Sequence, residues 1–314
     1  MISNKQIYVY DIETLASCFT YTALNTHNGN IIKYVLHKER FELLELIKHL
    51  QECKGQIGFN NINFDYPIIH KILTMYKYWL QKYKGCEYEI ITEIYNEAQR
   101  IIEEQNKPQF NVVVAIKSKE VLIPQLDLFK IWHYNNRARS TSLKSLEISM
   151  NYPNVMDMPI GHTRDDIRLD EIEGILDYNT NDVLATYEFY KKSIDKINLR
   201  KQLQEQFNIP CLNWSDSKIG EQLVLKLYCD KTGLSIWDVK EMRSERLKIA
   251  LNDVILPYIK FESEEFNKLL NKFKNSVITE TKGSIKESVI YNGMKYDYGT
   301  GGINYLSSLL VTLR

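Results

Sequence analysis

The sequence lacks the cysteine and histidine spacings that disulfide frameworks and zinc sites require. Its cysteines are odd in number, scattered and without a C-x-x-C pair, and no histidine lies at zinc-ligand spacing from a cysteine or another histidine. We therefore expect no structural zinc site. We interpret all five cysteines as reduced thiols of a cytoplasmic protein: Cys18, Cys53, Cys86, Cys211 and Cys229.

Long apolar runs and an excess of charge of either sign are also missing. No apolar stretch approaches the roughly 18 residues that a membrane-spanning helix needs, and the polar start does not resemble a signal peptide. We therefore expect a soluble protein without a membrane partner. Lys plus Arg equals Asp plus Glu at 40 each, so composition offers no basic field for nucleic acid. A neutral balance does not exclude such a partner, because carboxylates of a metal site would offset basic residues elsewhere.

The order of the expected elements indicates a mixed α/β sheet covered by helices. Residues 5–37 are rich in strand-forming residues and contain a hairpin signal at Asn28-Gly29. Apolar spacing predicts a helix within 38–53, and a short buried strand follows at 55–59. The remaining expected elements are helices over most of 66–105, strands at 112–114 and 121–123, helices within 140–207 and 216–275, and a hairpin at 289–296.

Two acidic residues near the beginning of the chain form the first candidate metal site. Asp11 and Glu13 end the apolar run that starts at Ile7, and residues two apart in a strand point to the same side. Two carboxylates this close repel each other unless a cation lies between them, and hard oxygen ligands suit Mg²⁺ or Mn²⁺. Taken alone, the pair is more simply explained as solvated residues at a strand end.

Three later residues give this pair its possible partners. Asp65 follows the expected buried strand and begins a helix, at a place where a rigid scaffold aims catalytic groups. Tyr178 and Asp182 are four residues apart in a helical stretch, so phenol and carboxylate share one helix face. A tyrosine one turn before a metal-binding aspartate can hold an attacking water. The simpler alternatives are a helix cap at Asp65 and an ordinary surface pair on the later helix.

The order of these motifs resembles that of the 3′→5′ exonucleases with four acidic residues. The motifs are Asp-Ile-Glu-Thr at 11–14, Asn-x-x-Asn-Phe-Asp at 60–65 and Tyr-x-x-x-Asp at 178–182. Asp177, where a second subclass has histidine, fits the tyrosine subclass. Over residues 5–195 the chain looks most like the proofreading domain of family B DNA polymerases, particularly those of bacteriophages. Gln125 to Leu128 and Ser142 to Leu146 resemble the segment between the second and third motifs.

The resemblance implies a role for each candidate residue. Two divalent ions, Mg²⁺ or Mn²⁺, would act at a DNA 3′ end; Asp11, Glu13 and Asp182 would hold the water-activating ion, with Asp11 bridging to the second. Asp65 would serve the second ion, and Tyr178 would orient the attacking water. The residues implied to contact the frayed single strand are Thr14, Asn60, Asn63, Phe64 and Lys144, with Phe64 stacking on a base.

The resemblance also implies an organisation of the whole chain. Residues 1–207 would form a ribonuclease-H-like exonuclease domain, and residues 208–314 a mainly helical extension ending in the hairpin. The segment 298–302 resembles the tyrosine-and-double-glycine motif that lies between exonuclease and polymerase domains, yet nothing resembles the polymerase palm motifs. We therefore expect a proofreading half whose partners are a single-stranded DNA 3′ end and a separate polymerase subunit. If a phage encodes it, the location would be the host cytoplasm.

Two other functions stay open at this point. An RNA exonuclease of the same mechanism would differ in contacts to the sugar 2′ position, which the sequence does not show. A non-catalytic DNA-binding accessory domain would gain nothing from clustered negative charge facing phosphates. Asp127 resembles a fifth ligand, but a structural role at a strand end is simpler. We expect Trp132, Trp214 and Trp237 in the core.

Overall fold

The computed structural model describes residues 6–105, 116–136, 139–242, 247–280 and 285–299, and the backbone of 302–306. The chain divides into two compact units, Met1–Tyr228 and Cys229–Arg314. The boundary falls further along the chain than the expected one after residue 207. The expected strand at 112–114 and two residues of the double-glycine segment, Thr300 and Gly301, lie outside the described residues.

The first unit is built on a mixed sheet that has six strands among the described residues, in the order β4-β3-β2-β1-β5-β6. The strands are β1 (Ile7–Leu15), β2 (Cys18–Asn25), β3 (Ile31–His37), β4 (Arg40–Phe41), β5 (Gly55–Gly58) and β6 (Gln125–Asp127). β1 to β4 pair antiparallel, whereas β5 pairs parallel with both β1 and β6. The predicted α/β class with a mixed sheet is confirmed, as is the hairpin at Asn28-Gly29.

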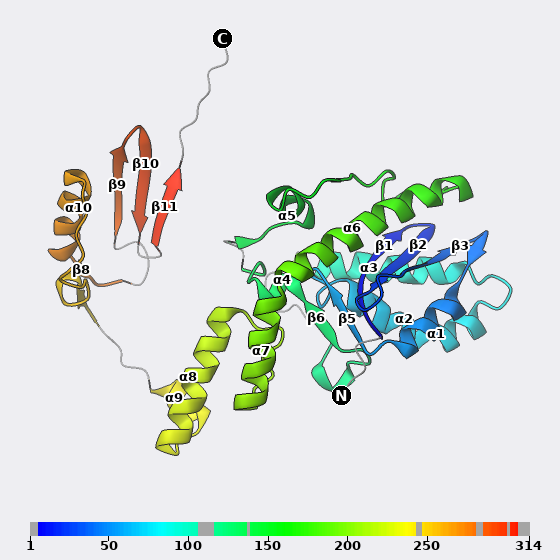
Figure 1. Ribbon diagram of the computed structural model, residues 1–314, viewed down its shortest axis with the longest axis horizontal. Coiled ribbons are helices and arrows are strands. Elements are labelled where there is room, and N and C mark those ends of the chain that lie inside the picture. The colour runs from blue at the N-terminus through cyan, green and yellow to red at the C-terminus, as the bar shows by residue number, and fades with distance from the viewer. Residues whose placement is uncertain are drawn as a thin grey trace, which may run out of the picture. The chain divides into compact units, whose positions relative to one another are not determined.

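Helices flank this sheet (Figure 1). They are α1 (Leu43–Glu52), α2 (Asp65–Lys82), α3 (Glu89–Gln105), α4 (Leu128–Ile131), α5 (Leu143–Ser149), α6 (Ile172–Lys192) and α7 (Ile194–Phe207). The apolar residues of α1 are spaced three and four apart, so they form one face, and this face is buried against the sheet. None of the helices within the described residues is long and apolar enough to span a membrane.

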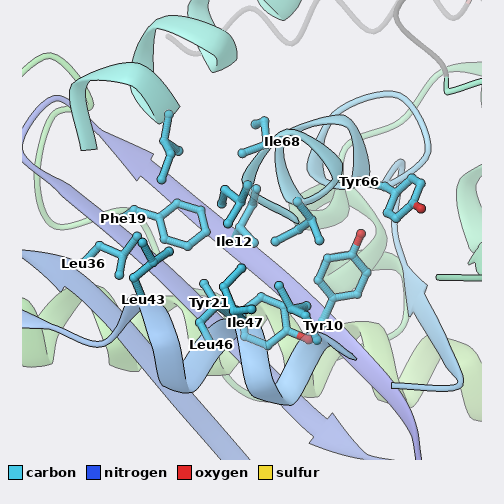
Figure 2. Packing of buried hydrophobic residues seen from close by; sticks show 14 of the residues in the cluster. Tyr10, Ile12, Phe19, Tyr21, Leu36, Leu43, Leu46, Ile47, Tyr66 and Ile68 are labelled. Carbon is cyan, nitrogen blue, oxygen red and sulfur yellow. The ribbon is translucent and has the colours of Figure 1, made fainter. Parts of the chain in front are cut away.

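The alternation of β1 decides which side chains face which helices. Tyr10 and Ile12 belong to the core cluster that also contains residues of α1, α2 and α3 (Figure 2). Val9 and Leu15 instead pack in clusters that contain residues of α6. Because side chains of a strand alternate between faces, Asp11 and Glu13 leave the sheet on the α6 side.

Two details of the predicted elements are wrong. Residues 121–123 form no strand, because the backbone N–H groups of Leu122 and Ile123 donate to the Tyr66 hydroxyl, at 2.7 and 3.1 Å, and the strand follows as β6. Trp237 is 75% exposed and contributes nothing to a core, while Trp132 and Trp214 are partly buried.

The second unit contains more strand than the expected helical extension. After α8 (Asp216–Thr232), which crosses the boundary, it comprises α9 (Ile236–Glu241), β7 (Ile249–Ala250), α10 (Glu264–Lys274), β8 (Val277–Ile278), β9 (Lys286–Tyr291), β10 (Met294–Gly299) and β11 (Gly302–Leu306). β9 and β10 form the predicted hairpin. Its turn residues Asn292 and Gly293 both have positive φ, at 51° and 74°, as a two-residue turn of this kind requires. β7, which pairs with β8, lies within the stretch 216–275 expected to be helical.

Candidate metal centre

Three of the predicted carboxylates meet on one face of the sheet. Asp11 and Glu13 come from β1 and Asp182 comes from α6, and each places an oxygen within 4.8 Å of the others. Glu13 is buried, and the other two are partly buried. Such a set of hard oxygen ligands can hold a divalent cation. Three of the four predicted carboxylates therefore form one cluster that could hold a metal ion, and its geometry leaves the identity of the ion open.

Burial and mutual repulsion disfavour the charged forms of these carboxyl groups. The pKa of Asp11 is raised well above its ordinary value by burial and by Asp65, Glu13 and Asp182. Burial followed by Asp182 and Asp65 likewise raises the pKa of Glu13. The pKa of Asp182 is raised by burial to about 6. A bound cation would remove this repulsion, so the residues present fit a divalent metal ion.

Asp65 lies beside the three-residue cluster rather than within it. It begins α2 after the turn that follows β5, and it is only 6% exposed. Burial raises its pKa to about 7, with a further contribution from Asp127, while the backbone N–H of Ile12 lowers it. Its charge in turn raises the pKa of Asp11.

Tyr178 stands one helical turn before Asp182 on α6, as predicted. Its hydroxyl hydrogen-bonds the Asp182 carboxylate, which lowers the pKa of Asp182. Burial, Asp182 and Glu13 raise the pKa of Tyr178, so the phenol stays protonated at neutral pH. A neutral hydroxyl beside two carboxylates can position a water molecule.

Two supporting groups escaped sequence reasoning. Asn179 donates from Nδ2 to Oδ2 of Asp11 at 2.6 Å. The Thr20 hydroxyl in turn donates to Oδ1 of Asn179 at 3.4 Å. Since Asn179 and Asp11 are 168 residues apart, no local pattern signals this contact. Asn181 donates to the buried Glu147, whose pKa is raised to about 7 by burial and by Asp182.

The Asp127 carboxylate stabilises the turn between β5 and α2 through hydrogen bonds. The carboxylate accepts from the backbone N–H groups of Asn60 at 3.0 Å and Ile62 at 3.4 Å, and also from Phe129 at 3.0 Å. Asn60 adopts a positive φ of 64°, a conformation that asparagine tolerates better than most residues. The predicted structural role of Asp127 is confirmed, since its oxygens are engaged in fixing the approach to Asp65.

A chain of buried amides anchors the same turn from the sheet. Asn61 donates to Oε1 of Gln125 at 2.8 Å, Gln125 donates to Gln56 at 2.9 Å, and Gln56 donates to the Tyr21 hydroxyl at 2.9 Å. Gly58 makes room for Asn61, because a Cβ at position 58 would lie 2.6 Å from the Asn61 Cβ. A glycine at position 58 therefore allows the turn to pack in the conformation that leads to Asp65.

The predicted strand-contacting residues occupy different environments. Thr14 is 7% exposed and lies next to Glu13 in the strand, so its side chain points to the opposite face from the carboxylates. Asn63 donates to the Asn60 side chain at 2.9 Å, and Phe64 is partly buried against the core. Lys144 forms an ion pair with Asp157, and its charge also lowers the pKa of Asp182.

No protein-family model, curated protein or solved structure matches this chain. The residues of the site combine oxygen ligands that suit a divalent cation with a neutral tyrosine hydroxyl.

Proposed function

We propose that the protein is a metal-dependent 3′→5′ exonuclease that releases nucleoside monophosphates from single-stranded DNA 3′ ends. One observation carries the proposal: Asp11, Glu13 and Asp182, which come from the first and third motifs, each offer an oxygen within 4.8 Å of the others. Their elements lie far apart in the sequence, so the meeting is a property of the fold. The mixed sheet with helices on both faces is compatible with the proposed ribonuclease-H-like fold.

Two divalent ions, Mg²⁺ or Mn²⁺, would supply an activated water and stabilise the leaving oxygen. Asp11, Glu13 and Asp182 would bind the first ion, and Asp65 the second. Asn179 holds the Asp11 carboxylate in one orientation through its 2.6 Å hydrogen bond, which keeps the other oxygen available as a ligand.

Tyr178 and Asp182 would act together on the attacking water. The tyrosine hydroxyl stays protonated and donates its proton to Asp182, so it offers a lone pair to a water O–H in a defined direction. Orientation of a reacting group can contribute about 100-fold to a rate, so the hydroxyl need not exchange its proton to matter.

The order of the three motifs supports a narrower proposal, that this is the proofreading part of a phage-type family B DNA polymerase. In that case a separate polymerase subunit would be the natural partner. An adjacent polymerase reading frame in the genome would support this narrower proposal without bearing on the chemistry.

The proposal is tested with a 5′-labelled single-stranded DNA incubated with Mg²⁺, with Mn²⁺ and with a chelator. We expect a ladder that shortens from the 3′ end only when a metal is present. Asp11→Asn and Asp182→Asn should abolish it, while Asp253→Asn, at an exposed position of the second unit, should not. A parallel single-stranded RNA decides between DNA and RNA substrates. Absence of shortening, or equal activity in Asp11→Asn, would refute the proposal.

A further inference from the structure

A second polar cavity lies in the first unit, outside the carboxylate cluster. Its volume is about 290 Å³, close to the lower end of small-molecule pockets. Polar and cationic side chains line most of it: Lys130, Asn135, Asn213, Trp214, Ser215 and Lys218. We call it the lysine cavity.

The lysine cavity carries the positive charge of two lysines, and Asp127 offsets part of it at Lys130. Among the described residues, neither Lys130 nor Lys218 has a carboxylate oxygen within 4.0 Å. The nearby Asp216 is already paired, with Arg200 and Lys196, both at 2.6 Å. The pKa of Lys130 is lowered, first by burial and also by Lys218, despite the attraction of Asp127. Two ammonium groups that repel across a cavity attract an anion between them.

An aromatic ring accompanies these charges. Trp214 is partly buried at the cavity wall, and the Lys218 ammonium lies 4.9 Å from its ring centroid. Cationic side chains that follow a backbone, combined with aromatic rings that stack on bases, are the usual means of binding single-stranded nucleic acid. A free inorganic anion has no base that could stack on the ring.

The same segments of the chain form the wall of the lysine cavity and lead to the metal centre. Ile62 lines the cavity and precedes Asp65 by three residues, a length of chain that spans at most about 11 Å. The Asp127 carboxylate accepts from the Ile62 N–H, and the Asp127 N–H donates to Oδ1 of Asn213 at 2.8 Å. The end of β6 therefore fixes the cavity wall and the approach to the carboxylates together.

We propose that the lysine cavity binds a phosphate of the single strand whose 3′ end lies at the carboxylate cluster, with the Trp214 ring stacking on a neighbouring base. This inference rests on the proposed function, because it places the 3′ end at the metal centre. The chemistry that it requires of the ligand is a phosphate group held in a strand with unpaired bases.

The test measures the affinity of 5′-labelled hexathymidylate by fluorescence anisotropy in an Asp11→Asn background, which prevents hydrolysis. We expect Lys130→Gln and Lys218→Gln each to weaken binding about tenfold at low salt. Each should also lower the slope of log affinity against log salt by about 0.7. Lys130→Arg, which keeps the charge, should bind within about twofold, and Lys231→Gln at the far end of α8 should have no effect. Thermal unfolding of every variant checks that the fold is intact.

Inorganic phosphate, which has no base, serves as the competitor. Hexathymidylate affinity and salt slope that match those of Lys231→Gln in both cavity variants would overturn the inference. So would inorganic phosphate competing as strongly as hexathymidylate. If the wild-type protein shortens no DNA while the lysine effects appear, the proposed function fails and the cavity remains a strand-binding site.

Discussion

At the scale of single residues, the candidate site concentrates groups that are costly to keep charged. Burial and the neighbouring carboxylates raise the pKa values of Asp11, Glu13, Asp65 and Asp182 together. Groups with strongly perturbed pKa values gather at functional sites more often than elsewhere. The arrangement destabilises the metal-free protein at neutral pH, and a cation reverses this effect.

Asp65→Asn tests this electrostatic strain. The pKa values of Asp65 and Asp182 are raised to about 7 and about 6, so the folded protein binds protons that the unfolded chain has released. Without metal, stability should therefore rise as the pH falls from about 8 to about 5. Asp65→Asn should raise the thermal midpoint at pH 8 by about 5 °C and flatten this rise. Thermal unfolding in chelator across this pH range measures both.

Titration of His49 changes the stability in the opposite direction as the pH falls. Burial lowers the pKa of His49 from 6.5 to about 4, so its contribution to stability is lost as the pH falls through that window. Because His49 is present in both proteins, it cancels in the comparison. Identical pH profiles for wild type and Asp65→Asn would contradict the account of repulsion.

Tyr178→Phe separates positioning of water from binding of metal. The substitution removes only the hydroxyl, so metal-dependent thermal stabilisation should be retained. The maximal rate should fall about 100-fold, because the water loses its orienting partner. Single-turnover rates and thermal midpoints with and without Mg²⁺ are the measurements. An unchanged rate would remove Tyr178 from the mechanism, and loss of metal stabilisation would make it a structural residue.

At the scale of elements, the site depends on one strand, one helix and one turn. β1 supplies two carboxylates on the face toward α6, and α6 supplies the third. The turn between β5 and α2 supplies Asp65, and it is held by Asp127 and by the amide of Asn61. The turn therefore has less freedom than an ordinary surface connection.

Gly58→Ala tests how tightly this turn is packed. The added methyl group would lie 2.6 Å from the Asn61 Cβ, so the turn must shift at a cost of about 1–3 kcal/mol. Since Asp65 follows the turn, metal-dependent activity should fall as well. Gly220→Ala is the matched control, because a Cβ there meets nothing within 4 Å. Equal thermal midpoints and rates for the two variants would show that the turn tolerates displacement.

Sequence patterns predicted which helices and strands form better than they predicted contacts between residues distant in the sequence. The alternation of β1 and the four-residue spacing of Tyr178 and Asp182 are local, so the faces they define could be predicted. The strand expected at 121–123 failed because a distant hydroxyl, that of Tyr66, accepts its backbone N–H groups. Asn179 was missed for the same reason: its partner Asp11 lies 168 residues away.

At the scale of the whole molecule, every candidate ligand lies in the unit Met1–Tyr228. The unit Cys229–Arg314 contributes a hairpin and short helices, and none of its described residues belongs to the carboxylate cluster. The chemistry proposed here therefore belongs to the first unit. A partner subunit would add specificity or delivery of the 3′ end rather than complete the cluster.

In the proposed mechanism, metal ions held by the carboxylates would act directly on the scissile phosphate. The most direct test replaces a nonbridging oxygen of the 3′-terminal linkage with sulfur, a poor ligand for Mg²⁺ and a better one for Mn²⁺. We predict that, for one diastereomer, single-turnover cleavage in Mg²⁺ slows at least about tenfold relative to the oxygen substrate and that Mn²⁺ restores most of the rate. An equal sulfur effect in both metals, or cleavage in chelator, would contradict the account.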